Sequence, residues 1–263
     1  MSRQSHPSRF KGDLHAEDSQ SRSHARKSRS PLQTQPYLES TCRRFKIGSF
    51  NVNHLSRPDG KQYTQEEYDK KIQWIAGQLD KMDCDIIGFQ EVIHGDALED
   101  AIKASLCYQE KPATLVMGVS GDLHRMAVLS RFPIVHHDSV REFPEEAIMH
   151  AEEQPSVDYF QRPVLRAKIR LPTGITCTVM ITHLKSQRPI IPRSTPQLSQ
   201  TPTNAALIRA IGMARALLRR TAEAVALRAL VLHELHTSTD PLVLVGDLNG
   251  ASEATTTELI SGM

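Results

Sequence analysis

The chain has 263 residues, 39% of them hydrophobic and 24% charged, and a formal net charge of +2. This length suits one large domain or two small ones. No apolar run approaches the length that spans a membrane, and the N-terminus lacks the apolar stretch of a secretion signal. The four cysteines show no paired metal-ligand spacing and no disulfide-rich pattern. We therefore expect a cytoplasmic protein with reduced thiols and without a transmembrane segment.

The charge is unevenly distributed along the chain. Residues 1–46 hold 10 Lys or Arg against 4 Asp or Glu, a net charge of +6, which leaves about −4 for the remainder. This segment is rich in Ser, Gln, His and Pro and has almost no apolar clustering. Such a composition cannot bury enough surface to offset the entropy lost on ordering. We predict a disordered basic tail over residues 1–44 and a folded domain over residues 45–263.

The first part of the domain alternates strand and helix patterns. Residues 45–52 alternate apolar and polar side chains, which indicates a strand. A helix should begin at Thr64, with Glu67 completing a capping box. The apolar run at 85–90 is typical of a strand buried on both faces, and another helix is expected over 95–106.

Strands follow near 114–119 and 126–130, and the chain turns at Pro133. The pattern then predicts a hairpin of two strands, 163–171 and 175–182, with the turn at Pro-Thr-Gly. The side chains expected to face the core of this hairpin are Val164, Ile169, Ile175, Val179 and Ile181.

The last part of the chain contains a Pro-, Ser- and Thr-rich loop at 185–203, a long helix at 204–235, a buried strand at 242–246 and a short helix at 253–261. Arginines along the long helix fit either a basic groove or a solvated helix face, and the second reading is favoured. They are Arg209, Arg215, Arg219, Arg220 and Arg228. The alternation of strands and helices predicts an α/β fold.

Polar side chains follow four apolar strands, each at the point where the strand ends. These residues are Asn51, Glu91, His183, and Asp247 with Asn249. In layered α/β folds, side chains beyond the carboxyl ends of strands converge on one crevice. Each residue alone has a plain structural explanation, such as a turn, an exposed acid or a satisfied core histidine. Five together make a shared site the better hypothesis.

This mixture of side chains suits hydrolysis of phosphate esters. A hard cation such as Mg²⁺ takes one or two carboxylates and completes its shell with water and substrate phosphate. Amides can position phosphate without adding negative charge, a histidine can donate to phosphoryl oxygens, and an aspartate can orient or deprotonate water. No cysteine or serine nucleophile pattern competes with this interpretation.

Five motifs resemble successive signatures of the endonuclease/exonuclease/phosphatase superfamily, in order and spacing. They are Phe-Asn-Val at 50–52, IIGFQEV at 86–92, LSRFPI at 129–134, THLKS at 182–186 and LVGDLN at 244–249. That superfamily includes deoxyribonucleases, abasic-site repair endonucleases, inositol phosphate phosphatases and sphingomyelinases. The resemblance implies a four-layered α/β sandwich of two packed sheets, the DNase I-like fold, and Mg²⁺ or Mn²⁺ as cofactor.

The resemblance also implies roles for individual residues. Glu91 would be the metal ligand with Asn51 as its helper, and His183 would contact the scissile phosphate. Asp247 would orient or activate the water, and Asn249 would bind phosphate. Arg162 resembles a basic residue that some nucleases of the superfamily place against the substrate backbone. An ordinary surface residue at the start of a strand is an equally good explanation of Arg162.

Two departures from the family pattern affect the functional prediction. Asn53 stands where the repair nucleases have Asp. The Ser-Asp-His signature that ends the family domain does not occur before Met263, so we expect the C-terminal strands to be missing and the second sheet to have open edges. Loss of the terminal Asp and His would lower the rate by about a hundredfold or more.

The sequence therefore predicts a divalent-metal phosphoesterase, which would be weak or inactive if the chain ends at Met263. Its substrate would be a phosphate ester, and nucleic acid is one candidate. The basic tail favours polyanions slightly. The alternative is a non-catalytic derivative of the same fold that binds nucleic acid or a protein partner. The oligomeric state is left open by the sequence.

Overall fold

The computed structural model describes residues 44–58, 64–121, 124–149, 157–191 and 201–262, all within one compact unit that begins at Cys42. The disordered tail predicted for residues 1–44 lies outside the described residues, apart from Arg44. Part of the predicted loop at 185–203 also lies outside them.

The first sheet has the strand order β1-β2-β4-β3. Strands β1 and β2 run parallel, whereas β4 is antiparallel to both β2 and β3. The strands are β1 (Ile47–Leu55), β2 (Ile86–Val92), β3 (Thr114–Met117) and β4 (Arg125–Ser130).

The second sheet has the order β5-β6-β7-β8, in which only the β7–β8 pair is parallel. Among the described residues β8 pairs on one side only, and its side chains are half-buried. The strands are β5 (Ile134–Glu142), β6 (Tyr159–Arg170), β7 (Thr176–His183) and β8 (Leu242–Asp247).

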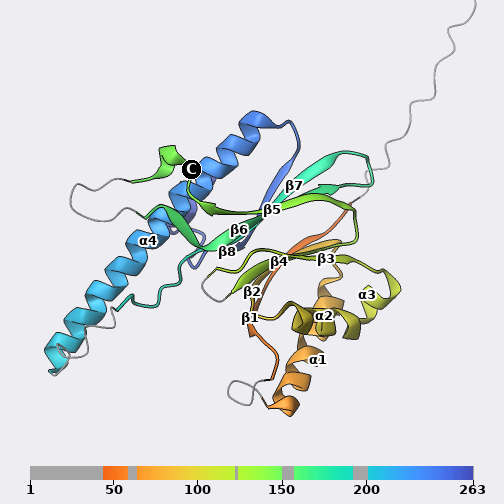
Figure 1. The fold of residues 1–263 in the computed structure, drawn as a ribbon, viewed down its shortest axis with the longest axis horizontal. Coiled ribbons are helices and arrows are strands. Elements are labelled where there is room, and N and C mark those ends of the chain that lie inside the picture. Colours follow the sequence, from red (N-terminus) through yellow and green to blue (C-terminus); the bar gives the residue numbers. More distant parts are fainter. Residues whose placement is uncertain (1–43, 59–63, 122–123, 150–156, 192–200, 263) are drawn as a thin grey trace, which may run out of the picture. The chain divides into compact units, whose positions relative to one another are not determined.

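The two sheets pack face to face, and helices cover their outer faces, which gives the four layers that the sequence predicts (Figure 1). Side chains of both sheets, including Val128, Leu165 and Ile181, form the buried layer between them. The sheets approach closely at Gly88, where a Cβ would lie 2.8 Å from side-chain carbons of Ile181 and Val245. Only glycine permits this contact.

One face of the first sheet is covered by α1, α2 and α3, and the outer face of the second sheet by α4 and α5. A short 3-10 helix, η1 (Glu145–Ala147), follows β5. The α-helices are α1 (Gln65–Met82), α2 (Gly95–Ala104), α3 (Leu106–Glu110), α4 (Pro202–Thr237) and α5 (Thr255–Ser261).

Helix α1 begins as predicted. Thr64 is its N-cap, its hydroxyl accepts from the Glu67 amide at 3.2 Å, and Glu67 accepts from the Thr64 amide at 2.9 Å. The helix predicted at 95–106 is confirmed as α2 (Gly95–Ala104) but ends two residues earlier, because Ser105 adopts an extended conformation between α2 and α3. Its hydroxyl donates to Asp80 on α1 at 2.6 Å, an alternative to a helical backbone that serine often takes.

Two further expectations need correction. Ile175 was expected to face the core but is 52% exposed, because it lies in the hairpin turn ahead of β7. Strand β5 was not predicted, since its sequence IVHHDSVRE carries few apolar residues and lies at the edge of its sheet.

The arginines of α4 divide between the two interpretations given above. Arg209 and Arg215 are exposed, but Arg220 is buried and donates to the Lys185 carbonyl at 3.3 Å.

Candidate active site

The two parallel strand pairs place the predicted site residues at one edge of the sandwich. In the first pair Asn51 on β1 is in register with Gln90 on β2, the residue before Glu91. In the second pair His183 on β7 is in register with Asp247 on β8. Because parallel strands end at the same edge of a sheet, the packed sheets bring all four side chains together.

Asn51 joins the two carboxylates of the cluster. Its side-chain Nδ2 donates to Glu91 Oε1 at 2.9 Å and to Asp247 Oδ2 at 3.0 Å, while its Oδ1 accepts from the Asn53 amide at 2.9 Å. The Asn51 amide therefore presents N–H groups, rather than its oxygen, to the carboxylates. Two carboxylates held by one amide repel each other unless a cation or proton balances them.

His183 completes this group from the second sheet. Its Nε2 lies 3.8 Å from Glu91 Oε1 and 3.7 Å from Asp247 Oδ2, and its side chain is only 2% exposed. One ligand atom from each of Glu91, His183 and Asp247 lies within 4.8 Å of the others. This donor set of two carboxylates and an imidazole fits a divalent cation.

Asn249 and Arg162 converge on the carbonyl of Leu184. Asn249 Nδ2 donates to that oxygen at 2.9 Å, and Arg162 Nη1 donates to it at 3.1 Å. The Asn249 backbone amide also donates to Asp247 Oδ1 at 2.9 Å. An amide nitrogen carries two hydrogens, so Asn249 Nδ2 retains one for another acceptor. Both side chains line the same pocket of about 370 Å³ as Glu91 and His183.

A model of the endonuclease/exonuclease/phosphatase family matches residues 48–262, which is most of the chain. The chain belongs to this family. Its fold is accordingly of the metal-dependent phosphoesterase type. A comparison with curated protein sequences finds no match.

Several solved structures share the fold. An endonuclease/exonuclease/phosphatase family protein from Bacteroides thetaiotaomicron is 15% identical, with a TM-score of 0.53 over 83% of this chain and 68% of that one. A mannosyl-6-phosphatase from the same species is 14% identical, with a TM-score of 0.52 over 83% and 70%. Truncated TDP2 from Caenorhabditis elegans is 17% identical, with a TM-score of 0.48 over 80% of this chain and 64% of that one. The chain thus spans less than two thirds of that protein. At these identities the likeness concerns the fold alone.

Burial makes His183 a neutral group in this member of the family. Desolvation and the nearby Arg162 charge lower the pKa of His183 to about 4, against the raising effects of Asp247 and Glu91. At neutral pH its imidazole therefore carries one N–H and one lone pair. It is suited to donate a hydrogen bond, not to supply a positive charge.

Glu91 is held in its ionised form. Burial of its carboxyl opposes ionisation, but the Asn51 hydrogen bond and nearby histidines outweigh this and lower the pKa of Glu91. Because His183 is neutral at neutral pH, the Asn51 hydrogen bond, and not a charge on His183, keeps the Glu91 carboxyl ionised there. An anionic Glu91 is what a cation requires.

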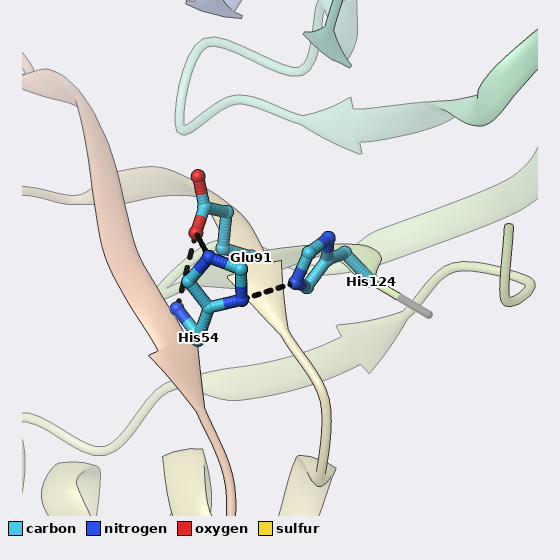
Figure 2. Close-up of side chains that lie close together, drawn as sticks. All are labelled: His54, Glu91 and His124. Carbon is cyan, nitrogen blue, oxygen red and sulfur yellow. Dashed lines mark hydrogen bonds and ion pairs between the residues drawn. The ribbon is translucent and has the colours of Figure 1, made fainter. Parts of the chain in front are cut away.

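Two further histidines, His54 and His124, cluster with Glu91 and were not predicted from the sequence (Figure 2). His54 Nε2 lies 3.2 Å from Glu91 Oε2, and His54 Nδ1 lies 2.7 Å from His124 Nε2. A usable signal existed for His124: it precedes β4, and the start of a strand antiparallel to β2 lies beside the end of β2. His54 lies three residues after Asn51, near the end of the same strand, but the pairing shifts register between Asn51 and Leu55, so the sequence pattern does not give the direction of its side chain.

Lys185 and Glu223 were also missed as parts of the site. Lys185 lies within the family-like THLKS motif and lines the pocket, and its Nζ donates to the carbonyl of Arg188 at 3.0 Å. Burial and the charge of Arg162 lower the pKa of Lys185. Glu223 on α4 is 1% exposed and accepts from the backbone amides of Gln161 at 3.1 Å and Lys185 at 2.6 Å. Helix α4 thereby holds the segments that carry Arg162 and His183.

The backbone at the site departs from regular geometry. Asn53, His54, Glu91 and Asn249 all have positive φ angles, of 49°, 54°, 63° and 52°. Non-glycine residues in this conformation cost on the order of 1 kcal/mol or more each, and such residues cluster at functional sites. Gly246 (φ 152°) precedes Asp247, and a Cβ there would lie 2.0 Å from the Thr182 carbonyl oxygen. Glycine therefore sets the approach of β8 to β7 next to Asp247.

Proposed function

We propose that this chain hydrolyses phosphate esters, phosphodiesters or phosphomonoesters, with Mg²⁺ or Mn²⁺ bound at Glu91. One observation carries the proposal: the Asn51 amide holds Asp247 beside Glu91, and Glu91 lines a pocket together with Arg162 and His183. Binding of a cation requires carboxylates such as Glu91 and Asp247, and binding of a phosphate group next to it requires a cationic side chain such as Arg162.

Each residue has a role that follows from its position. The bound cation would polarise the phosphoryl oxygens and stabilise the leaving oxygen. Asn51 fixes the Glu91 carboxylate that holds it. Arg162 and the remaining N–H of Asn249 bind phosphate oxygens, and neutral His183 donates an N–H to one of them.

Asp247 acts on the water. Its Oδ1 is held by the Asn249 amide, and its Oδ2 lies on the side of Asn51 and His183. The water oxygen bonds to phosphorus, its proton passes to Asp247, and the phosphorus–oxygen bond to the leaving group breaks. The departing oxygen takes a proton from solvent.

We further propose that the substrate is a polyanion and that the protein acts in the cytoplasm. From Tyr159 to Ala222 the chain contains no Asp or Glu, and this stretch includes Arg162, Lys185 and Arg188 of the pocket. Such a basic stretch favours a polyanion, and nucleic acid is the natural test substrate. The thiols of Cys84, Cys107 and Cys177 are free, which fits the cytoplasm. Among the described residues no helix is both long and apolar enough to cross a bilayer.

The test measures Mg²⁺- and Mn²⁺-dependent hydrolysis of bis(4-nitrophenyl) phosphate, 4-nitrophenyl phosphate and DNA. We expect chelation by EDTA to abolish activity, and Glu91→Gln and Asp247→Asn each to lower kcat/KM by about a hundredfold or more. Glu99→Gln, an exposed carboxylate on α2 that pairs with Lys103, serves as the matched control and should retain full activity.

The proposal is wrong if Glu91→Gln leaves metal-dependent hydrolysis unchanged. DNA binding that depends on salt, ignores EDTA and occurs without hydrolysis would instead support the non-catalytic alternative.

A further inference from the structure

His54, Glu91 and His124 form a cluster (Figure 2) that shares Glu91 with the group of Glu91, His183 and Asp247. His54 is near the end of β1, Glu91 is on β2 and His124 directly precedes β4. One ligand atom from each lies within 4.8 Å of the others. All three side chains line the pocket of about 370 Å³, so the cluster is open to solvent ions.

We propose that His54, His124 and Glu91 form a second cation site, selective for a divalent transition ion such as Zn²⁺, Co²⁺ or Mn²⁺. This site shares Glu91 with the proposed hydrolytic site, but His54 and His124 have no role in the proposed hydrolysis. Two imidazole nitrogens and one carboxylate oxygen are donors that suit Zn²⁺ and its neighbours, whereas Mg²⁺ and Ca²⁺ prefer oxygen.

The spacing of the donor atoms fits such an ion. Ligand atoms at about 2.0–2.1 Å from a tetrahedral Zn²⁺ lie about 3.3 Å from one another. The separations here are 3.2 Å between His54 Nε2 and Glu91 Oε2, and 2.7 Å between His54 Nδ1 and His124 Nε2. These two separations use different nitrogens of the His54 ring, so one ion requires a rearrangement that places a single His54 nitrogen beside both neighbours. One ligand atom of each residue already lies within 4.8 Å of the others.

The two oxygens of Glu91 face different groups. Oε1 accepts from Asn51 and lies toward His183, whereas Oε2 accepts from the His54 amide at 3.1 Å and lies beside the His54 ring. One carboxylate can therefore serve a cation on each side. Carboxylates that bridge two cations place them about 3.5–4 Å apart.

The backbone provides an independent argument. His54 and Glu91 both have positive φ angles, and the strand pairing shifts register at both places, between Asn51 and Leu55 and between Phe89 and Val92. Regular strands would point these side chains elsewhere. The backbone is thus irregular at His54 and Glu91, the two positions whose side chains lie side by side with donor atoms for a cation. Irregular backbone of this kind is typical of ligand sites.

A hydrogen-bonded chain from Glu91 through His54 to His124, without an ion, is the competing explanation. The two can be distinguished by metal binding alone. Co²⁺ serves as the probe, because its visible absorption reports coordination by nitrogen and its affinity can be measured by titration calorimetry.

The experiment compares the wild-type chain with His124→Asn and, as matched control, His233→Asn, which replaces an exposed histidine on α4. We expect wild-type protein and the control to bind two Co²⁺ ions per chain, one with a nitrogen-type spectrum. His124→Asn should lose that spectrum and weaken the binding of one ion by tenfold or more. Crystals soaked in Co²⁺ should show anomalous density between Glu91 and His124.

The inference is overturned if His124→Asn keeps the spectrum and both affinities, in which case the histidines form only a hydrogen-bonded chain. Should His124→Asn fail to fold, His54→Gln and the anomalous density of the wild-type crystal decide the same question. Histidine-dependent Co²⁺ binding without hydrolysis would uphold this site and reject the proposed function. Mg²⁺-dependent hydrolysis with no such binding would do the reverse.

Discussion

The two sheets contribute to the site in different ways. The first sheet supplies Asn51, Glu91 and the two histidines from strand ends with shifted register and positive φ angles. The second sheet supplies His183 from the regularly paired β7, Asp247 directly after Gly246 (φ 152°), and Arg162 from the part of β6 where pairing with β5 shifts register. The buried Glu223 of α4 fixes the backbone beside Arg162 and His183.

The two histidines differ in solvent exposure, although the sheets as a whole do not, since the Glu91 side chain is 15% exposed and that of Asp247 34%. The His54 side chain on the first sheet is 38% exposed, but the His183 side chain on the second is 2% exposed. A histidine near the surface can exchange ligands with solvent, whereas a buried one stays neutral and oriented. His54 is therefore suited to exchange ligands with solvent, and His183 to keep one orientation.

The largest expected effect distinguishes the histidines of the two sheets. Substitution His183→Asn should lower kcat/KM with Mg²⁺ by about 10²–10³, because a preorganised donor to the phosphoryl oxygen is lost. Steady-state hydrolysis of bis(4-nitrophenyl) phosphate measures this, with His233→Asn as control. Equal losses for His183→Asn and His124→Asn would mean that the two sheets do not differ in this way.

A second substitution removes the support of the second sheet. Glu223→Ala leaves the amides of Gln161 and Lys185 without their buried acceptor, at a cost of about 1–3 kcal/mol for each unsatisfied group. We expect the free energy of unfolding in urea to fall by at least the lower figure for each amide. The exposed Glu258→Gln on α5 is the control. An unchanged unfolding midpoint would show that α4 does not support this region.

The smallest effect concerns Glu234, further along α4. Burial of its carboxyl opposes ionisation, but the Thr178 hydrogen bond at 2.8 Å and the charges of Lys168 and Arg166 outweigh it, so the pKa of Glu234 is lowered. A carboxyl whose pKa is lower in the folded state stabilises the fold above its unfolded pKa, and this stabilisation is lost as the pH falls.

Wild-type protein should therefore lose more thermal stability between pH 7 and pH 4 than Glu234→Gln does. The difference should be smaller than the loss caused by Glu223→Ala, and Mg²⁺-supported hydrolysis at pH 7 should be unaffected. Melting curves at the two pH values measure it. Parallel losses in both proteins would assign the acid sensitivity to other carboxyls.

Regular elements of the fold were predictable from sequence, and irregular ones were not. Thr64 and Glu67 gave the start of α1, and apolar strands followed by polar residues led to Asn51, Glu91, His183, Asp247 and Asn249, which the structure brings to one edge. Their roles remain predictions. His54 was not recognised because its direction depends on a shift in strand register that no periodic pattern encodes. Glu223 was not recognised because its partners are backbone amides distant in sequence.

The hydrogen bond between Asn51 and Asp247 joins residues 196 positions apart. Contacts over such separations require the closure of a very long loop, so they form late in folding. Glu91 and the histidines, by contrast, belong to a sheet whose strands all lie before Ile134. During synthesis the strands of this first sheet are therefore complete, and accessible to solvent ions, while β8 with Asp247 is still being made.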